Sequence, residues 1–494
     1  MFAGILRYRV PRAVLTGGSC LALFAGMGLA YARPWNHAWL LCACAAVPLW
    51  WVLRRHGLVA LVFVALCFFG VGWQRGSSVS RQLAHYKPLA FHKVTLLGTA
   101  AEDSATGTHH QLAFALSNIY GAESVRQPLP GAVSVAGFGP PLVRRGDTVR
   151  VSGKLYPGFG GSQGSMSFAT VQVFAHHPSY IDDGRRRFAA GLQSALPEPL
   201  ASFGMGLLIG QRNTLPTDTA HMLLVGLTHI IAVSGYNLTV IVDVVRRLFA
   251  GRSKFQTAAG CVSLILLFVT LTGSSPSIVR AAIISVLSIL AWYYGRTIPP
   301  FVLLLAAGCI SVLANPLYLW GNISWYLSFL AFFGVVVVAP LVTKRLCGAR
   351  EPPALLALII ESLCAEAMTL PYVLHTFGQM SLVGLPANVL VVAFVPLAML
   401  LCMVAGLAGM LLPAAAGWLA WPAKWLLTYM LDAANVLSRT PHSFIQGIGF
   451  PLPFMLAAYA LIIWFAMLTG LKLHTKYAII TEKKQLERQK GESA

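Results

Sequence analysis

The sequence predicts a polytopic α-helical membrane protein with one inserted extracytoplasmic β-domain, and three observations predict it. The 494 residues are 57% hydrophobic and 11% charged, whereas soluble globular chains are about 25% charged. Long apolar segments recur from Ala13 to Gly470. A polar region with short β-like runs, residues 75–187, interrupts them. This pattern argues against a soluble enzyme and excludes a fibrous or disordered chain.

The N-terminal region, residues 1–74, contains three apolar segments that we expect to cross the bilayer. They are 13–31, 38–53 and 57–74, each close to the ~20 residues that a crossing needs. The tripeptide Ala30-Tyr31-Ala32 resembles a signal-peptidase site. Cleavage there, the less favoured outcome, would still leave the region that follows outside the cytoplasm.

Residues 75–187 are expected to form a small extracytoplasmic β-barrel or sandwich. Runs such as Val94–Gly98 and Thr148–Val151 are separated by turn signals such as Arg145-Gly146-Asp147. Closely spaced short strands with such punctuation are typical of these folds. The region contains no cysteine, so we expect no disulfide in it.

The third region, residues 188–470, resumes the apolar pattern. Its predicted crossings are 224–245, 256–273, 277–294, 299–314, 324–341, 354–376, 381–397, 398–412 and 452–470. Together with the N-terminal segments they predict about twelve transmembrane helices.

Two C-terminal segments differ from these crossings. Within residues 414–440, Trp418, Trp421 and Trp425 recur at helical spacing beside charged groups, a pattern that predicts an interfacial helix. Residues 471–494 are polar and basic and predict a cytoplasmic tail.

Loop charges predict the orientation, because cytoplasmic loops carry an excess of Lys and Arg. With twelve crossings, every basic loop cluster falls on the cytoplasmic side, together with both termini. The protein is therefore expected in the plasma (inner) membrane, in contact with lipid. The clusters are Arg7, Arg9 and Arg12; Arg54 and Arg55; Arg246, Arg247, Arg252 and Lys254; Arg296; Lys344, Arg345 and Arg350; and the lysines and arginine of the tail.

Polar residues inside the apolar segments are functional candidates, because a charge at the bilayer centre costs about 2.5–3.5 kcal/mol on insertion scales. By this argument five residues are expected to face a cavity or one another: His229, Asp243, Arg280, Glu361 and Glu366. For Asp243, which abuts Arg246 and Arg247 at the membrane edge, a structural role is favoured. The alternative is a clamp between helices that only holds the bundle together. Ser234-Gly235 lies in mid-segment and could break its helix against protein or a water-filled cavity.

Motifs of several enzyme classes are missing from the sequence. It contains no Gly-x-x-x-x-Gly-Lys-Ser/Thr phosphate loop and no His-x-His-x-Asp-His metal cluster. We therefore expect no metal, no cofactor, and no ATPase or metallohydrolase in this chain.

Four ordered motifs resemble those of the ComEC family of competence proteins, the inner-membrane channels for DNA uptake. The first is Gly226-Leu-Thr-His-Ile-Ile-Ala-Val-Ser-Gly-Tyr-Asn237 and the second is Thr272-Gly-Ser-Ser-Pro-Ser-Ile-Val-Arg-Ala281. The third joins Asn315-Pro to Leu327-Ser-Phe-Leu-Ala331. The fourth comprises Thr369-Leu-Pro371, Phe377-Gly-Gln-Met-Ser381 and Asn388.

Two departures from the family pattern matter. The first motif usually has a second histidine where this chain has Asn237, so a mechanism that needs two histidines is in doubt. Larger members also end in a metallo-β-lactamase-like domain, and no such motif occurs before Ala494. The resemblance therefore implies transport and not nuclease activity by this polypeptide.

The resemblance implies passage of single-stranded DNA across the inner membrane during natural transformation. It also implies a periplasmic DNA receptor and a cytoplasmic helicase-type partner. The polar residues of the four motifs are the candidates for the transport pathway: His229, Ser234, Gly235, Asn237, Pro276, Arg280, Glu366, Pro371 and Asn388.

The outer region resembles the small OB-like domain that the family carries after its first membrane helices. Such a domain binds single strands through a basic groove and stacking aromatic residues. Residues 75–187 contain twelve Lys and Arg against six Asp and Glu. The DNA-binding candidates are Arg144, Arg145, Arg150, Lys154, Tyr156, Phe159, Arg185, Arg186 and Arg187.

Two other functions remain open at this point. The same helical bundle could form a channel or transporter for another substrate. An enzyme of the membrane interface is the least favoured, because its one nucleophile–base candidate, Ser234 with His229, lies on different helix faces at five-residue spacing. The oligomeric state is also open.

Overall fold

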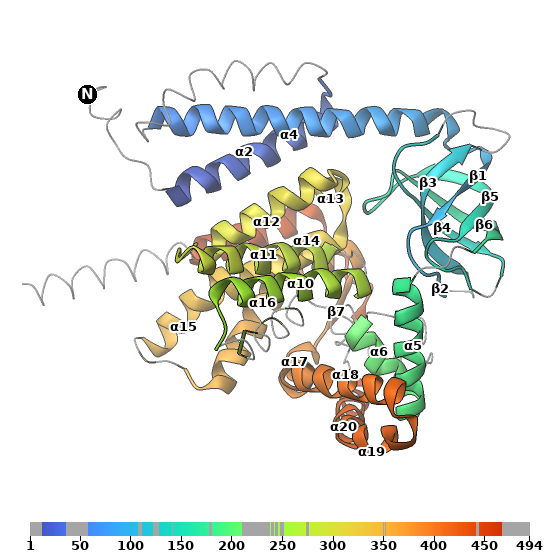
Figure 1. The fold of residues 1–494 in the computed structure, drawn as a ribbon. Helices are drawn as coiled ribbons and strands as arrows, with labels where there is room; N and C mark the ends of the chain where they lie inside the picture. The colour runs from blue at the N-terminus through green and yellow to red at the C-terminus, as the bar shows by residue number, and fades with distance from the viewer. Residues whose placement is uncertain are drawn as a thin grey trace, which may run out of the picture. The chain divides into compact units, whose positions relative to one another are not determined.

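A computed structural model describes most of the chain in two compact units (Figure 1). The described residues are 12–35, 58–106, 111–121, 128–140, 142–176, 180–209, 251–272, 276–348, 352–440 and 444–466, with the single residues 238, 242, 246, 247 and 350. The first unit takes its members from 1–219, 229–326 and 395–428. The second takes them from 220–228, 327–394 and 429–494.

The helices are α2 (Arg12–Ala32), α4 (Leu58–Tyr86), α5 (Tyr180–Ala195), α6 (Leu200–Ile209), α10 (Lys254–Thr272), α11 (Pro276–Tyr293), α12 (Pro300–Ala314), α13 (Leu317–Gly321), α14 (Ile323–Phe333), α15 (Ala339–Cys347), α16 (Ala354–Phe377), α17 (Gly384–Val391), α18 (Val395–Leu411), α19 (Ala416–Leu419) and α20 (Trp421–Ser438). A π-helical turn, η3 (Gly334–Val338), joins α14 to α15. A 3-10 turn, η4 (Val392–Phe394), joins α17 to α18.

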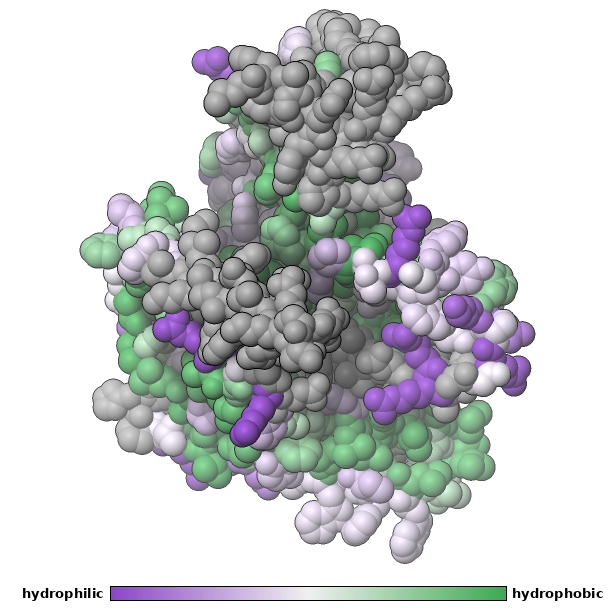
Figure 2. All heavy atoms as spheres, turned by 90° about the vertical axis from the view of Figure 1, so that its left-hand side faces the viewer, coloured by the Kyte–Doolittle hydropathy of each residue, from purple (hydrophilic) through white to green (hydrophobic). Residues whose placement is uncertain are grey.

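Five helical runs are long and apolar enough to cross a membrane: Ala13–Ala32, Leu61–Leu89, Ile323–Cys347, Ala354–Phe377 and Gly384–Leu411. Four shorter apolar helices accompany them: Lys254–Thr270, Ser277–Tyr293, Pro300–Ala314 and Leu452–Ala466. On the face drawn in Figure 2, hydrophobic residues form broad areas and strongly hydrophilic residues occupy smaller groups. Broad exposed apolar surface fits contact with lipid, so the predicted helical membrane protein is confirmed.

The structure differs from the prediction at one pair of crossings. Segments 381–397 and 398–412 were expected to cross separately, but Gly384–Leu411 is one helical run of 28 residues. At about 1.5 Å per residue it is long enough for one crossing and too short for two. Pro396 lacks a backbone N–H, and the tighter turn η4 just before it keeps the chain helical. Counting this pair once leaves eleven of the twelve expected crossings. The total is still a prediction, since 38–53 and most of 224–245 lie outside the described residues.

Glycines bring helices of the first unit close together. A Cβ added to Gly26 of α2 would lie 2.1 Å from the carbonyl oxygen of Phe69, and one added to Gly72 of α4 would lie 2.3 Å from that of Leu23. Between α5 and α18, a Cβ on Gly409 would lie 1.9 Å from the Gly191 carbonyl oxygen. Contacts this close need glycine, as in many helix pairs that pack in membranes.

The β-domain is a closed barrel at the C-terminal end of α4 (Figure 1). Its strands are β1 (Lys93–Ala100), β2 (Ala105–Thr106), β3 (Leu112–Gly121), β4 (Val133–Phe138), β5 (Thr148–Pro157) and β6 (Gly164–Ala175). Around the barrel the order is β1-β3-β4-β6-β5, and β1 pairs with both β3 and β5 to close it. The β4–β6 pair is parallel and the other pairs are antiparallel.

The barrel has its own apolar core. Leu96, Leu116, Val135, Val151 and Met166 each have no exposed surface. The predicted β-domain is thereby confirmed, with its strands between residues 93 and 175. α4 continues through residues 75–86 and α5 begins at Tyr180, so helices occupy both ends of the expected range 75–187. The other expected boundaries, at 74, 188, 470 and 471, remain predictions.

The second unit contains a short two-stranded sheet beside α16. β7 (Gln379–Ser381) pairs with β8 (Phe444–Gln446) in antiparallel register. The α16 side chain of His375 bonds through Nδ1 to the Phe450 carbonyl oxygen at 2.9 Å. Gly378 ends α16 in the left-handed conformation with φ of 61°, which glycine adopts without strain.

The predicted interfacial segment is helical over α19 and α20. Trp418, Trp421 and Trp425 are all well exposed, Trp418 at 86%. Amphipathic aromatic side chains of this kind favour the level of the lipid headgroups, so the interfacial placement near 414–440 remains our prediction for them.

Candidate functional site

Cations and aromatic residues share the outer face of the barrel. On β5, buried residues alternate with partly or fully exposed ones. Arg150, Lys154 and Tyr156 occupy the outward positions, because successive side chains of a strand point to opposite faces. The structure therefore brings together three of the predicted DNA-binding residues.

Neighbouring strands extend this face with residues that the sequence prediction missed. In the β1–β5 register Lys93 lies opposite Lys154. Phe168 on β6 is 72% exposed and Phe174 is 57% exposed. Phe138 on β4 is also exposed, and its ring centroid lies 6.3 Å from that of Phe168. We call the set Lys93, Arg150, Lys154, Phe91, Tyr156, Phe138, Phe168 and Phe174 the cation–aromatic face.

Cations and rings on this face are in direct contact. The Arg150 guanidinium carbon lies 4.7 Å from the centroid of the Phe174 ring. Lys154 Nζ lies 5.7 Å from the centroid of Tyr156. The Phe91 ring packs edge-on against Tyr156 at 6.0 Å. Such cation–π pairs orient the side chains at the surface. Phe168 and Phe174 are an even number of residues apart, so they share one face of a strand. This spacing is the sequence signal that could have revealed the aromatic residues of the face.

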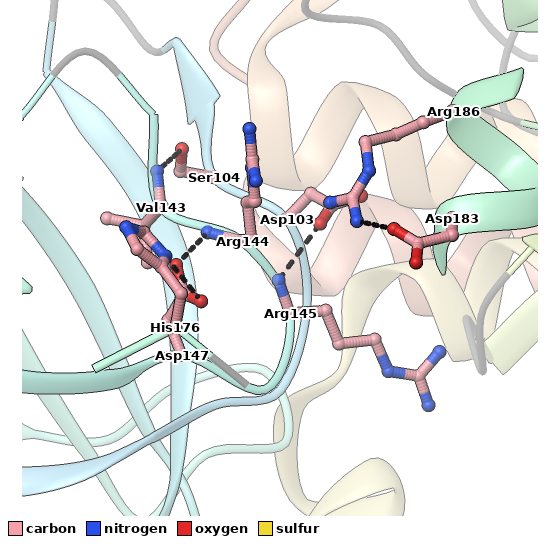
Figure 3. A network of polar contacts seen from close by, with 9 residues as sticks. All are labelled: Asp103, Ser104, Val143, Arg144, Arg145, Asp147, His176, Asp183 and Arg186. Atoms are coloured by element: carbon pink, nitrogen blue, oxygen red, sulfur yellow. Dashed lines mark hydrogen bonds and ion pairs between the residues drawn. The ribbon is translucent and has the colours of Figure 1, made fainter. Parts of the chain in front are cut away.

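Arg144 and Arg145 lie elsewhere, in the turn that precedes β5 (Figure 3). The buried Asp147 carboxylate accepts the Arg144 backbone N–H at 2.8 Å through Oδ2 and bonds His176 Nδ1 at 2.9 Å through Oδ1. The Asp103 carboxylate accepts the Arg145 N–H at 2.9 Å. In Figure 3 the two arginine side chains leave this turn in different directions.

The two ends of β5 therefore carry separate groups. Arg145 lies before Thr148, where the strand begins, and Tyr156 lies near its end at Pro157. The ten-residue strand spans about 33 Å at ~3.3 Å per residue. The predicted cluster of Arg144, Arg145, Arg150 and Lys154 is thus spread along the length of the strand.

Arg185, Arg186 and Arg187 lie in the second turn of α5, where acidic residues balance two of them. The Arg185 guanidinium pairs with Asp103 at 3.5 Å and with Asp182 at 3.4 Å. Arg186 pairs with Asp183 (Figure 3). Arg187 is exposed. This helix start is therefore less basic than its sequence indicates.

Phe159 is separated from the cation–aromatic face by its place on the β5–β6 loop. It is 67% exposed, and its ring lies near Gly321 of α13, 3.8 Å from where a Cβ would stand. The loop therefore carries Phe159 toward the membrane helices of its own unit.

Two transport candidates belong to α11 in the first unit. Pro276 is the first residue of the helix, a position that suits proline because its missing N–H has no helical partner there. Arg280 lies one turn further on and is 6% exposed. A buried guanidinium in an apolar helix fits the predicted position facing protein and not lipid.

Three transport candidates belong to α16 and α17 in the second unit. Glu366 is half-buried, and its Oε1 would lie 3.4 Å from a Cβ added to Gly384, the first residue of α17. Pro371 is buried within α16. Asn388 Oδ1 is buried and has no hydrogen-bond partner among the described residues.

The helix around Pro371 is supported by side chains. The Thr369 hydroxyl donates to the Ala365 carbonyl oxygen at 3.1 Å, and the Tyr459 hydroxyl donates to that of Met368 at 3.0 Å. Proline within a helix removes one backbone hydrogen bond, and these two side-chain bonds hold the turn that precedes it. Glu366 lies beside Gly384 at the start of α17. A purely structural role is therefore also open to it, since the helix dipole favours a carboxylate near a helix N-terminus.

The first motif lies outside the described residues. His229, Ser234, Gly235 and Asn237 belong to this part of the chain. Among the residues that the structure describes, no three His, Cys, Asp or Glu side chains gather into a metal-binding group.

Comparison with known proteins identifies the family. The family model described as "Competence protein" matches residues 207–472. The chain is also similar to ComE operon protein 3 of Bacillus subtilis (strain 168), at 26% identity over 265 residues, which are 51% of this chain and 33% of that protein. The match thus spans about a third of the length of that relative. No solved structure matches the chain. The resemblance to ComEC proteins is confirmed, and because the family model covers more than half of the sequence, the chain belongs to the competence protein family.

Proposed function

We propose that this protein carries single-stranded DNA across the inner membrane during natural transformation, with the barrel as its DNA-binding domain. Family membership supports a role in DNA uptake. The observation that carries the proposal is the cation–aromatic face, where Arg150 and Lys154 stand among exposed rings. Single strands are bound by such interleaving, because cations attract the phosphates while rings stack on the bases.

The barrel is proposed to be an OB fold. An OB fold is a five-stranded Greek-key barrel, and its members often bind oligonucleotides on the second and third strands. Here those strands are β3 and β4. Their outward positions carry small residues such as Ala113, Ala115 and Ser134. We therefore place the DNA on β1 and β5, which carry the cations, and on β6, which carries Phe168 and Phe174.

The transport pathway is proposed to be lined by the polar residues of the family motifs. Arg280 is buried in α11 and Glu366 is half-buried in α16. Pro276, Pro371 and Asn388, together with the first-motif residues His229, Ser234, Gly235 and Asn237, complete the set. The sequence carries no phosphate-loop motif. The driving force is therefore assigned to a partner or to the proton gradient. The family resemblance favours a helicase-type partner in the cytoplasm and a periplasmic receptor that delivers the DNA to the barrel.

A binding experiment tests the role of the barrel. The full chain in detergent is titrated with a fluorescent single-stranded oligonucleotide at several salt concentrations. We expect affinity to fall as salt rises, with a slope of about 0.7 per phosphate contacted. Arg150→Gln and Lys154→Gln should each lower the slope by about 0.7, the value for one phosphate contact. Lys344→Gln, on α15, is the matched control and should bind like the wild type.

Affinity that does not depend on salt would contradict the proposal, and so would an equal effect of Lys344→Gln. Transport is tested separately by deleting the gene and measuring labelled DNA in the cytoplasm. Loss of uptake that is restored by the wild-type gene but not by Arg280→Ala supports the pathway. Normal uptake in the deletion strain would refute it.

A further inference from the structure

Two asparagines, Asn315 of the third family motif and Asn322 between the two parts of that motif, each make two contacts at once. The Asn315 side-chain oxygen accepts the N–H of Leu317, the first residue of α13, at 3.1 Å. The Asn322 side-chain oxygen accepts the Trp325 N–H at 2.8 Å and caps α14. Each side-chain amide then donates to the β5–β6 loop of the barrel. Asn315 Nδ2 bonds the Gly161 carbonyl oxygen at 3.1 Å, and Asn322 Nδ2 bonds that of Gly160.

These two contacts, with a helix start and with the β5–β6 loop, explain why both residues are asparagines. Asp, Ser and Thr cap helices about as well as Asn. Asn differs because its side chain holds an acceptor and two donors, so it can cap a helix and bond a carbonyl oxygen at the same time. Asn322 is 7% exposed, so its contacts are shielded from water.

The loop is shaped for this contact. Gly160 and Gly161 both have positive φ, at 70° and 120°. A Cβ on Gly161 would lie 3.1 Å from the Tyr318 ring and 3.3 Å from Asn322 Nδ2. Glycine therefore permits both the backbone conformation and the close approach of the loop to α13.

The segment that receives the loop is itself held by membrane helices. Arg75 of α4 donates to the Leu313 and Ala314 carbonyl oxygens at the end of α12, at 2.9 and 3.0 Å. Trp320 Nε1 of α13 donates to the Met27 carbonyl oxygen of α2 at 3.2 Å. The loop thus docks on a site that three membrane helices stabilise.

We infer that Asn315 and Asn322 are positioning residues that fix the β5–β6 loop on α13 and thereby hold the barrel, with Phe159, at the membrane helices of its unit. The consequence of this docking rests on the proposed function: a DNA strand that is bound by the barrel reaches the membrane helices at this point. Docking is then needed for uptake and not for binding of DNA by the barrel.

Asparagine-to-aspartate variants separate docking from helix capping. The double variant Asn315→Asp/Asn322→Asp keeps both cap acceptors but removes both donors and sets carboxylates against carbonyl oxygens. The double alanine variant removes caps and donors together. Asn435→Asp on α20 is the matched control, since the Asn435 Oδ1 accepts from Arg439 Nε and the change retains that acceptor.

Hydrogen exchange of the full chain in detergent is the deciding measurement. In the aspartate variant, the amides of residues 158–163 should exchange about tenfold faster than in the wild type, as expected from the loss of two hydrogen bonds. Amides of α13 and α14 should exchange as in the wild type. In the alanine variant, both the loop and the helix starts should exchange faster. Asn435→Asp should leave the loop unchanged.

Two functional measurements complete the test. Oligonucleotide affinity of the aspartate variant should stay within about twofold of the wild type, because the cation–aromatic face is intact, while uptake of DNA should be lost. Loop exchange equal to the wild type, or normal uptake with a released loop, would overturn the inference. Failure of the wild type to bind oligonucleotide would instead refute the proposed function, and loop exchange would still decide the docking.

Discussion

The Arg150 guanidinium lies over the ring of Phe174, with 4.7 Å between its central carbon and the ring centroid. Arg150 Nε is buried and has no hydrogen-bond partner among the described residues. The ring covers one side of the cation, while Phe174 itself remains 57% exposed. A base could therefore stack beside a cation that is already oriented for a phosphate.

Phe174→Leu should weaken oligonucleotide binding at least about fivefold, because stacking of a base on an aromatic ring contributes about 1–3 kcal/mol. The salt slope should stay the same, since no charge is removed. Fluorescence titration at three salt concentrations measures both quantities. Phe255→Leu, a change of a phenylalanine on α10 that is 67% exposed, is the control. A reduced slope in Phe174→Leu would show that the ring acts through the charge of Arg150 and not through stacking.

Gly72→Ala should destabilise the protein by about 1–3 kcal/mol, the usual range for an overpacked core. The added Cβ would lie 2.3 Å from the Leu23 carbonyl oxygen, so α2 and α4 must separate. The midpoint of thermal unfolding in detergent is the measurement. Gly28→Ala lies on the same helix pair, where an added Cβ meets nothing within 4 Å. The control should be neutral or slightly stabilising, because alanine favours helices over glycine. Equal midpoints for the two variants would contradict the close packing.

Much of the fold could be predicted from local sequence. Hydropathy identified most of the helices, and the turn signals around Gly146 identified a β-domain, because bilayer thickness and backbone conformation act over short stretches. The junction between α17 and α18 was misjudged. A break was expected within the long apolar run 381–412, yet the structure absorbs Pro396 with one tighter turn.

The candidate site was less predictable, because it depends on strand register. Lys154 and Tyr156 could be placed on one face from their spacing along β5. Lys93 joins them through the pairing of β1 with β5, which are distant in sequence, and Phe168 lies where the register of β5 with β6 shifts. The docking of Gly161 on Asn315 spans 154 residues, and neither residue type predicts its partner.

The three arginines of α5 should contribute unequally to DNA binding. Arg185 and Arg186 pair with aspartates, whereas Arg187 is exposed. Arg187→Gln should therefore lower the salt slope by about 0.7, the value for one contact with a single strand. Arg186→Gln should change the slope less, since the Asp183 carboxylate already balances that charge. Titration of both variants against the same oligonucleotide compares them directly. A larger decrease in the slope for Arg186→Gln than for Arg187→Gln would mean that a phosphate of the DNA displaces Asp183 from Arg186.

The orientation of the chain needs a direct measurement, because Gly384–Leu411 is one helical run where two crossings were expected. The basic tail should still be cytoplasmic, since Lys and Arg near membrane segments resist translocation. Residues 75–187 contain no native cysteine, so Tyr120→Cys, at a position 58% exposed on β3, reports on the barrel. A thiol reagent that cannot cross membranes should label Tyr120→Cys in intact spheroplasts beyond the wild-type background. Ser493→Cys should gain label only after the membrane is opened. Label on Ser493→Cys in intact spheroplasts would place the tail on the same side of the membrane as the barrel, which requires an even number of crossings between them.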